Sequence, residues 1–238
     1  MAKVDYTLKE HVALVTLNDG ENRFNPPFLE SYMAVLDEIE AETDARVLVA
    51  RSSHEKIFCN GIDLEWLAPI VQKGEIETAK AYFHQLNRLF YRLVTYPLIT
   101  IAAINGHAFA GGAIMACGFD FRFMQTGRGF FCFPEVDLGI PFLPGMNAML
   151  CKAMPMDTVV EMELTGVRLT AEQCRERGIV YKASPSETLL ADCLEFGRAL
   201  KKERSVIAEM KKRLYRPIIH AIEVEDGPYI ESGRYNIG

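Results

Sequence analysis

The sequence predicts an α/β fold with a mostly helical C-terminal portion. Short runs of β-branched and aliphatic residues alternate with amphipathic helical stretches up to Pro155, and only helical patterns follow it. The chain has 238 residues, of which 49% are apolar, so it is long enough to bury a large core. Because no linker-like stretch marks a junction, residues 1–155 and residues 156–238 are expected to be parts of one functional unit.

The elements of the first part follow from local patterns. Val12–Leu17 is a strand-like run that ends at an Asn-Asp-Gly turn, and Asn25 is the expected N-cap of a helix that begins with two prolines. The inward face of that helix is expected to consist of Leu29, Met33, Leu36 and Ile39. A second amphipathic helix is predicted at 77–94, and further strands are predicted at 47–50, 98–104 and 119–124.

Helices are predicted throughout the last third of the chain. Their expected ranges are 157–164, 170–177, 186–204 and 205–223. The second of these begins with Thr170 and has Gln173 three residues later, which is the pattern of a capping box.

Composition excludes several classes of protein. The 32 acidic residues exceed the 26 Lys and Arg, and the net charge of −6 argues against a nucleic-acid-binding protein. The 24% of charged residues is close to the globular average, which excludes a mainly disordered chain. Residues 93–119 lack Asp, Glu, Lys and Arg, but proline, glycine, asparagine and histidine interrupt them. A strand, a turn and a buried helix are therefore expected there, with no membrane span.

Cysteine and histidine positions indicate a reduced protein without a metal. The six cysteines form no C-x-x-C pair, and several lie in apolar runs, where free thiols behave as small hydrophobic groups. The five histidines are scattered without ligand spacing. The N-terminal residues lack an apolar signal core, so a cytoplasmic location is expected.

Two segments share a strand exit, a glycine turn and a helix start. They are residues 58–64 (Phe-Cys-Asn-Gly-Ile-Asp-Leu) and residues 105–113 (Asn-Gly-His-Ala-Phe-Ala-Gly-Gly-Ala). Glycine allows close approach to the main chain, and the first N–H groups of a helix have no internal partner. Two such turns facing each other could direct N–H donors at a developing oxyanion. A pair of ordinary glycine turns is the alternative interpretation.

A third segment, residues 130–141, places Glu135 among aromatic and aliphatic side chains. Burial in such surroundings raises the pKa of a carboxyl group, which suits Glu135 as a general base near neutral pH. A capping or solvent-exposed glutamate is the alternative. Asp137 would share a face with Glu135 in an extended segment, but a backbone-capping role is the favoured interpretation.

These three segments, in this order, resemble the motifs of the crotonase family, the enoyl-CoA hydratases and isomerases. The resemblance extends over about residues 4–203. It rests on the Gly-Asp turn at 58–63, the Asn-Gly-rich stretch at 105–112, Pro-Glu at 134–135, Leu-Gly at 138–139, Leu-Thr-Gly at 164–166 and Gly-Ile-Val at 178–180. Ala110 replaces the first glycine of the family's Gly-Gly-Gly run.

The resemblance implies a crotonase-like spiral of strand–strand–helix turns. It places the CoA-thioester site in residues 1–155 and gives the C-terminal helices a role in forming a homotrimer or hexamer. It implies an acyl-CoA substrate, with coenzyme A as part of the substrate and no separate cofactor. The backbone N–H groups of Ile62 and Gly111 align with the family's oxyanion hole. The other substrate-binding positions suggested are Arg23, Phe24, Gly61, Asp63 and Gly112.

Departures from the family pattern favour one reaction. Hydratases of the family use two glutamates, and here Ile114 stands where the first is expected, while Glu135 matches the second. A single base facing an oxyanion hole suits the transfer of a proton from C2 to C4 of a 3-enoyl-CoA. The resemblance is therefore strongest to Δ3,Δ2-enoyl-CoA isomerases. The dienoyl-CoA isomerase branch is less favoured because Leu143 occupies the place of its additional acid.

Alternative functions remain open at this point. An enoyl-CoA hydratase and a non-catalytic acyl-CoA-binding homologue are the main ones. A Cys59–His107 acyl-transfer pair is also conceivable, since each residue lies beside one of the glycine turns. Basic groups at 201–204 and 211–213 could contact CoA phosphates, although a solvated helix face explains them as well.

Overall fold

The framework of the protein is a six-stranded sheet and a three-stranded sheet, in a computed structural model that describes residues 2–235. The larger sheet has the order β1 (Val4–Lys9), β2 (Val12–Leu17), β3 (Val47–Ser52), β5 (Ile99–Ile104), β7 (Phe121–Gln125) and β9 (Lys182–Ser184). The smaller sheet has the order β4 (Ile57–Cys59), β6 (His107–Phe109) and β8 (Phe131–Cys132). Neighbouring strands are parallel except for the antiparallel pair β1 and β2.

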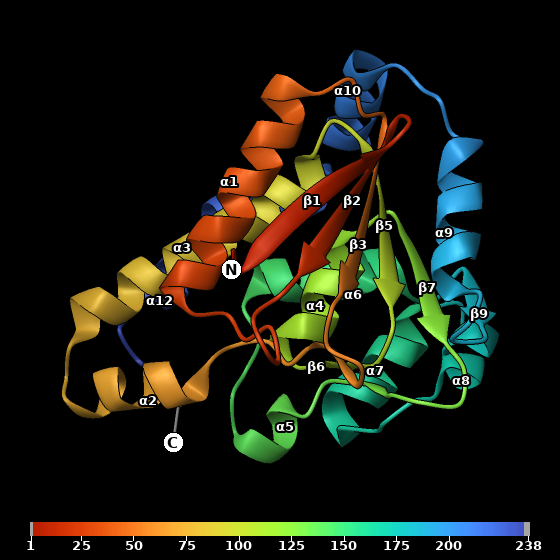
Figure 1. The fold of residues 1–238 in the computed structure, drawn as a ribbon. Helices are drawn as coiled ribbons and strands as arrows, with labels where there is room; N and C mark the ends of the chain where they lie inside the picture. The colour runs from red at the N-terminus through yellow and green to blue at the C-terminus, as the bar shows by residue number, and fades with distance from the viewer. Residues whose placement is uncertain (1, 236–238) are drawn as a thin grey trace.

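Helices cover both faces of the larger sheet (Figure 1). α1 (Pro26–Glu42) and α3 (Ile76–Thr95) lie on one side, and α9 (Leu189–Arg198) packs across β2, β3, β5 and β7 on the other. The other helices before residue 180 are α2 (Leu64–Gln72), α4 (Gly111–Gly118), α5 (Glu135–Leu138), α6 (Pro144–Ala153), α7 (Met156–Thr165) and α8 (Ala171–Glu176). The C-terminal series is α10 (Arg204–Leu214), α11 (Arg216–His220), the π-helical turn η1 (Ala221–Glu225) and α12 (Asp226–Glu231).

Successive turns of the chain build both sheets together. β3 is followed by β4, β5 by β6 and β7 by β8, so each turn adds one strand to each sheet, and helices follow each pair. This is the spiral of ββα turns that the sequence resemblance implied. The predicted α/β class, the crotonase-like spiral and the helical C-terminal portion are confirmed.

Strand alternation produces two hydrophobic clusters. In β2, Val12 and Leu14 face the cluster beneath α9, while Ala13 and Val15 face the main core. Successive side chains of a strand point to opposite faces, so a run of apolar residues in a doubly covered parallel sheet is buried on both sides. The main core extends through α1, α3 and α4 and supports the smaller sheet.

Most predicted elements of the first part are confirmed. β2 has the predicted bounds, and the Asn25 side chain caps α1 by accepting a hydrogen bond from the Phe28 N–H at 3.1 Å. The uncharged stretch 93–119 contains the end of α3, strands β5 and β6 and the buried helix α4. Thr170 and Gln173 form the predicted capping box of α8. Among the described helices, none is long and apolar enough to cross a membrane.

Two C-terminal helices were predicted with the wrong lengths. The first is shorter than predicted, and α10, α11 and η1 take the place of the second. The helix predicted at 186–204 is limited to α9, and the chain then crosses to α10, whose first residue, Arg204, donates to main-chain carbonyls at the end of α1. The helix predicted at 205–223 is interrupted at Tyr215, where Pro217 supplies no N–H to continue α10. Strands β1 and β9 were not predicted from the sequence.

Candidate active site

Three adjacent parallel strands of the smaller sheet bring the predicted site segments together. The turn after β4 carries Ile62, the turn after β6 carries Gly111, and the segment after β8 carries Glu135. Because β4, β6 and β8 run parallel, their carboxyl ends meet at one edge of the sheet. All three residues line one cavity at that edge.

The two glycine turns touch each other through their main chains. Gly61 has φ +75°, and a Cβ atom built on it would lie 2.4 Å from the Gly111 nitrogen. A Cβ built on Gly112 would lie 2.1 Å from the carbonyl oxygen of Cys59. Both separations are too short for any side chain, so glycine at these two positions is what allows the turns to approach.

The approach leaves two N–H groups side by side. Gly111 is the first residue of α4, so its N–H has no partner within the helix. The hydrogen bonds found among residues 2–235 include none donated by the N–H groups of Ile62 or Gly111. A Cβ built on Gly111 would lie 3.4 Å from the Ile62 nitrogen, which places these donors next to each other. An arrangement of this kind can stabilise a developing oxyanion.

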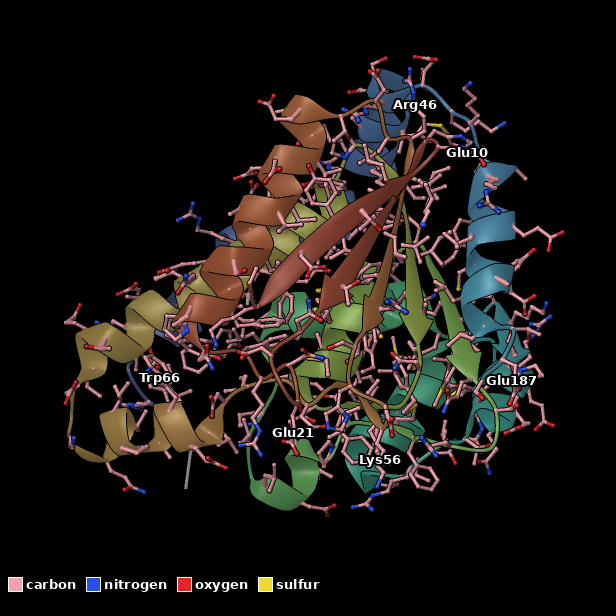
Figure 2. All side chains as sticks on the ribbon, viewed as in Figure 1. Glu10, Glu21, Arg46, Lys56, Trp66 and Glu187 are labelled. Carbon is pink, nitrogen blue, oxygen red and sulfur yellow. The ribbon has the colours of Figure 1, made fainter. Side chains whose placement is uncertain are left out.

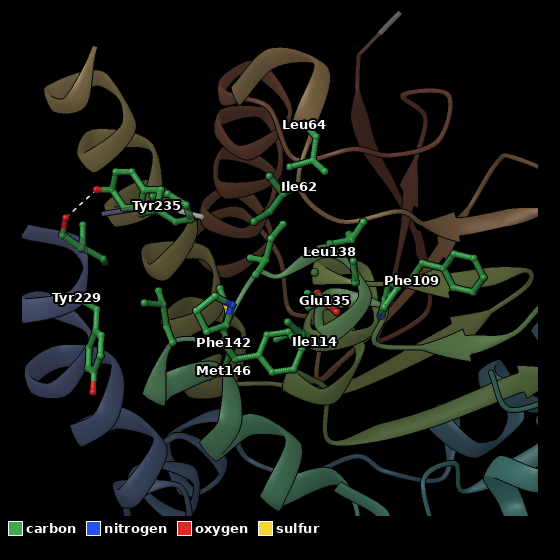
Figure 3. Close-up of a pocket in the computed structure, with 18 of the residues that line it drawn as sticks. Ile62, Leu64, Phe109, Ile114, Glu135, Leu138, Phe142, Met146, Tyr229 and Tyr235 are labelled. Atoms are coloured by element: carbon green, nitrogen blue, oxygen red, sulfur yellow. Dashed lines mark hydrogen bonds between the residues drawn. The ribbon is translucent and has the colours of Figure 1, made fainter. Parts of the chain in front are cut away.

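The cavity has a volume of about 550 Å³, and Glu135 is the buried carboxylate among its described lining residues (Figure 3). The side chain is 8% exposed, and its Oε2 atom has no hydrogen-bond partner in the described chain. Burial raises the pKa of Glu135 to about 8; a hydrogen bond with its own backbone N–H opposes this effect, and the charge of Glu163 adds to it. A carboxyl group with this pKa can accept and return a proton near neutral pH.

Apolar side chains surround Glu135. Ile114, on the first turn of α4, is 1% exposed and lines the cavity together with Glu135 (Figure 3). Leu143 and Phe142 line the same cavity. A second lining carboxylate, Glu65, has an 82% exposed side chain and is paired with Arg23 at 2.6 Å. The interior of the cavity therefore presents one acid in an apolar setting.

The sequence profile of the enoyl-CoA hydratase/isomerase family matches residues 7–225. The chain belongs to this family. Among curated relatives, enoyl-CoA delta isomerase 3 of Arabidopsis thaliana is 29% identical over 89% of this chain and 91% of its own length. A putative enoyl-CoA hydratase of Thermus thermophilus is 33% identical over 92% of this chain and 85% of its own. Members named as isomerases and as hydratases are thus both similar to this chain.

A solved structure of the family has the same fold. The enoyl-CoA isomerase of Mycobacterium tuberculosis superposes with a TM-score of 0.87, covering 97% of this chain and 98% of that one at 21% identity. Such an identity supports the shared fold and leaves the reaction to be argued from the site.

The remaining predicted substrate-binding residues differ from one another in whether they line the cavity. Arg23 lines the cavity, but its guanidinium is held by Glu21 and Glu65. Asp63 is outside the lining and caps α2 by accepting the Trp66 N–H. Gly61 and Gly112 are buried between the turns.

Phe24 lies in the core and outside the cavity lining. Its side chain is fully buried, does not line the cavity and packs against the rings of Phe28 and Phe90. A Cβ on Gly111 would lie 3.1 Å from the Phe24 ring, so this ring supports the Gly111 turn from behind. The core encloses the Phe24 side chain, so only the main chain of this suggested substrate-binding position is left to contact a ligand.

Sequence reasoning missed the C-terminal wall of the cavity. This wall consists of Tyr229, Ile230, Ser232, Arg234 and Tyr235. No motif marks these residues, since they reach the cavity only through the folding of α12 against α3. Phe83, Phe142 and Met146 also line the cavity, whereas Leu86 is fully buried in the core.

The acyl-transfer alternative has no support in the geometry. The Cys59 thiol is fully buried, donates to the Asn22 carbonyl at 3.0 Å, and has its pKa raised by burial to about 12. His107 instead accepts the Phe130 N–H through Nδ1 at 3.3 Å.

Asp137 is exposed on α5. Within residues 2–235, no cluster of three His, Cys, Asp or Glu side chains could hold a metal ion.

Replacement of Ala110 by glycine is expected to stabilise the protein by about 1 kcal/mol. Ala110 has φ +51° and ψ −133°, a conformation that costs an alanine about 1–3 kcal/mol. The greater freedom of glycine in the unfolded chain offsets about 0.4–1 kcal/mol of that gain. Chemical denaturation measures the difference.

The control is Ala113→Gly, three residues later in α4 at a buried helical position, which should lose about 1 kcal/mol of helix propensity and about 1 kcal/mol more with the buried methyl group. Equal losses at positions 110 and 113 would show that the Ala110 backbone stores no strain.

Proposed function

We propose that this protein is a Δ3,Δ2-enoyl-CoA isomerase. The observation that carries the proposal is the single buried carboxylate, Glu135, in a cavity whose wall holds the adjacent N–H groups of Ile62 and Gly111. Ile114 supports this choice over hydration, because this lining residue stands where the resemblance places the other glutamate of a hydratase, and an aliphatic side chain cannot bind or activate water. Membership in the enoyl-CoA hydratase/isomerase family supports an acyl-CoA substrate.

In the proposed reaction the carboxylate of Glu135 removes a proton from C2 of a 3-enoyl-CoA. The electron pair of the broken C–H bond delocalises into the thioester carbonyl and over the C3–C4 double bond. The N–H groups of Ile62 and Gly111 hold the oxygen as it becomes negative, an interaction that is strongest in the transition state. Glu135 then returns the proton to C4, which gives the 2-trans-enoyl-CoA and regenerates the carboxylate.

The substrate supplies its own coenzyme A in this proposal, and no separate cofactor takes part. Arg23 lines the cavity and is the cation proposed to bind CoA phosphates, for which it would exchange its partners Glu21 and Glu65. The homotrimer or hexamer and the cytoplasmic location expected from the sequence stay predictions.

A direct assay distinguishes the proposal from its alternatives. The purified protein is given 3-enoyl-CoA, and formation of the conjugated 2-enoyl thioester is followed spectrophotometrically. Hydration of crotonyl-CoA at a rate above that of isomerisation would establish the hydratase instead. Calorimetric binding of acyl-CoA without conversion of any thioester would establish a non-catalytic binding protein.

The pH dependence of kcat/KM should show one ionisation near pH 8. Glu135 acts as a base only when ionised, and burial raises its pKa to about 8. The rate should therefore rise about tenfold per pH unit below that value and level off above it. Steady-state kinetics between about pH 6 and pH 9 measure the profile. A flat profile across this interval would argue against Glu135 as the base.

A further inference from the structure

The C-terminal segment 226–235, here called the strap, forms one side of the cavity. Its lining residues come from α12 and from the stretch that follows this helix. In Figure 3, Tyr229 and Tyr235 occupy the side of the cavity away from Phe109, and Glu135 lies between them and Phe109. The strap is therefore placed to limit how far a ligand can extend past Glu135.

A buried carboxylate anchors the start of the strap. Asp226 is fully buried; its Oδ2 accepts a hydrogen bond from Asn87 Nδ2 at 2.8 Å, and its Oδ1 accepts one from the Gly145 N–H at 2.8 Å. These bonds join α12 to α3 and to the first turn of α6. The strap thus has a fixed position relative to two helices that also line the cavity.

A ring stack closes the far end of the strap. The Tyr235 ring lies 4.7 Å from the Phe83 ring, centroid to centroid, at an interplanar angle of 28°. The Tyr235 hydroxyl donates to the Ile230 carbonyl at 2.7 Å, the dashed line in Figure 3. Phe83 is 8% exposed and belongs to the core, so its ring is a firm support for Tyr235.

Apolar lining residues gather on α3, α6 and α12, whereas polar lining residues come from the turns around α1 and α2 and from the strap itself, which contributes Ser232 and Arg234. Asn60, Arg23 and Glu65 come from the turns that precede α1 and α2 and from the start of α2. Phe83, Phe142, Met146 and Ile230 come from α3, α6 and its preceding turn, and α12. A ligand with one charged end and one aliphatic end would therefore place its aliphatic end against the apolar group of Phe83, Phe142, Met146 and Ile230, beside the Tyr235 ring.

We propose that Tyr235, held against Phe83, is the end wall of the acyl-binding pocket and sets the length of acyl chain that this protein accepts. The inference rests on the proposed function only for the acyl-CoA nature of the ligand. A chain that stops short of the ring gains affinity with each added methylene, whereas a longer chain must displace the stack or leave its end in water.

The test measures affinity, so it does not depend on turnover. Calorimetry with saturated acyl-CoA thioesters from butanoyl to hexadecanoyl should show binding that becomes about fourfold tighter per methylene. This gain should stop at one chain length, here called the break, beyond which the affinity no longer rises. In Tyr235→Ala the break should move by about two to four methylenes, the room that the lost ring vacates. Tyr235→Phe keeps the ring and should keep the wild-type break. Phe83→Leu, on the other side of the stack, should move the break in the same direction as Tyr235→Ala.

Identical breaks in the wild type and in Tyr235→Ala would overturn the inference, as would a moved break in Tyr235→Phe. Failure of the wild type to bind any acyl-CoA would overturn it together with the proposed substrate class. If acyl-CoA binds with a break that Tyr235→Ala moves but no thioester is isomerised, the inference holds and the proposed reaction fails.

Discussion

The Glu135→Gln variant is expected to lose isomerase activity by about 10³-fold in kcat while it retains acyl-CoA affinity. The amide has the size of the carboxylate but cannot accept the C2 proton, and a positioned general base contributes about 10²–10⁴-fold. Because Glu135 is 8% exposed in a largely apolar cavity, no described side chain is placed to replace it. Spectrophotometric turnover of a 3-enoyl-CoA and calorimetric binding of a saturated acyl-CoA measure the two quantities.

A matched carboxylate is available as the control. Asp137 lies on the same short helix α5 but is exposed and outside the cavity, so Asp137→Asn should change kcat by less than about threefold. If Asp137→Asn lost as much activity as Glu135→Gln, Asp137 would have to act as the base or share that role, and the capping role favoured from the sequence would be wrong.

A stability measurement on the Glu135→Gln variant distinguishes loss of the base from misfolding. The folded-state pKa of Glu135, about 8, exceeds its ordinary value of 4.5, so between these values the unfolded chain releases a proton that the folded chain keeps. Wild-type stability therefore falls as pH rises through this window, and glutamine has no such dependence. At pH 7 the Glu135→Gln variant should be more stable than the wild type by roughly 1–3 kcal/mol. An inactive variant that is also less stable would point to misfolding.

The catalytic part of the candidate site could be predicted from the sequence because its pieces are local. Each of Ile62, Gly111 and Glu135 lies within three residues of a strand end, in a short stretch with its own glycine or proline signal. The resemblance to a family then supplied the relation among the three stretches. The structure accounts for that relation physically, since β4, β6 and β8 are parallel neighbours whose carboxyl ends meet.

The parts that could not be predicted depend on tertiary contacts. Tyr235 reaches the cavity because Asp226 is bound by Asn87, 139 residues earlier in the chain, and no local pattern encodes that pairing. Phe24 was suggested as a substrate-binding position, but its place in the core follows from the packing of its ring against Phe28 and Phe90, which no local pattern shows. Arg204, one of the basic residues considered for CoA phosphates, donates instead to carbonyls at the end of α1. In the helical C-terminal portion, long-range packing therefore outweighs local propensity.

The Gly61→Ala variant is expected to lose at least about 10²-fold in kcat. A Cβ at this position would lie 2.4 Å from the Gly111 nitrogen and 2.8 Å from both the Gly111 Cα and the Gly112 nitrogen, and all three atoms belong to main chain that cannot rotate away. The turn that carries Ile62 must therefore shift from the turn that carries Gly111. Loss of one donor from an oxyanion hole costs about 10²–10³-fold in kcat, and the shift misplaces the pair.

Gly74→Ala isolates the steric effect from backbone strain. Gly74 has the same φ, +75°, but a Cβ there would meet nothing within 4 Å. Both variants should lose about 1–2 kcal/mol of stability from the positive φ, and Gly61→Ala should lose more because of the clash. Only Gly61→Ala should lose activity, with kcat affected more than the affinity for saturated acyl-CoA, because the oxygen becomes negative only during the reaction. Equal kcat values for Gly61→Ala, Gly74→Ala and the wild type would show that the contact between the two turns is not needed for turnover, and the oxyanion role of Ile62 and Gly111 would have to be abandoned.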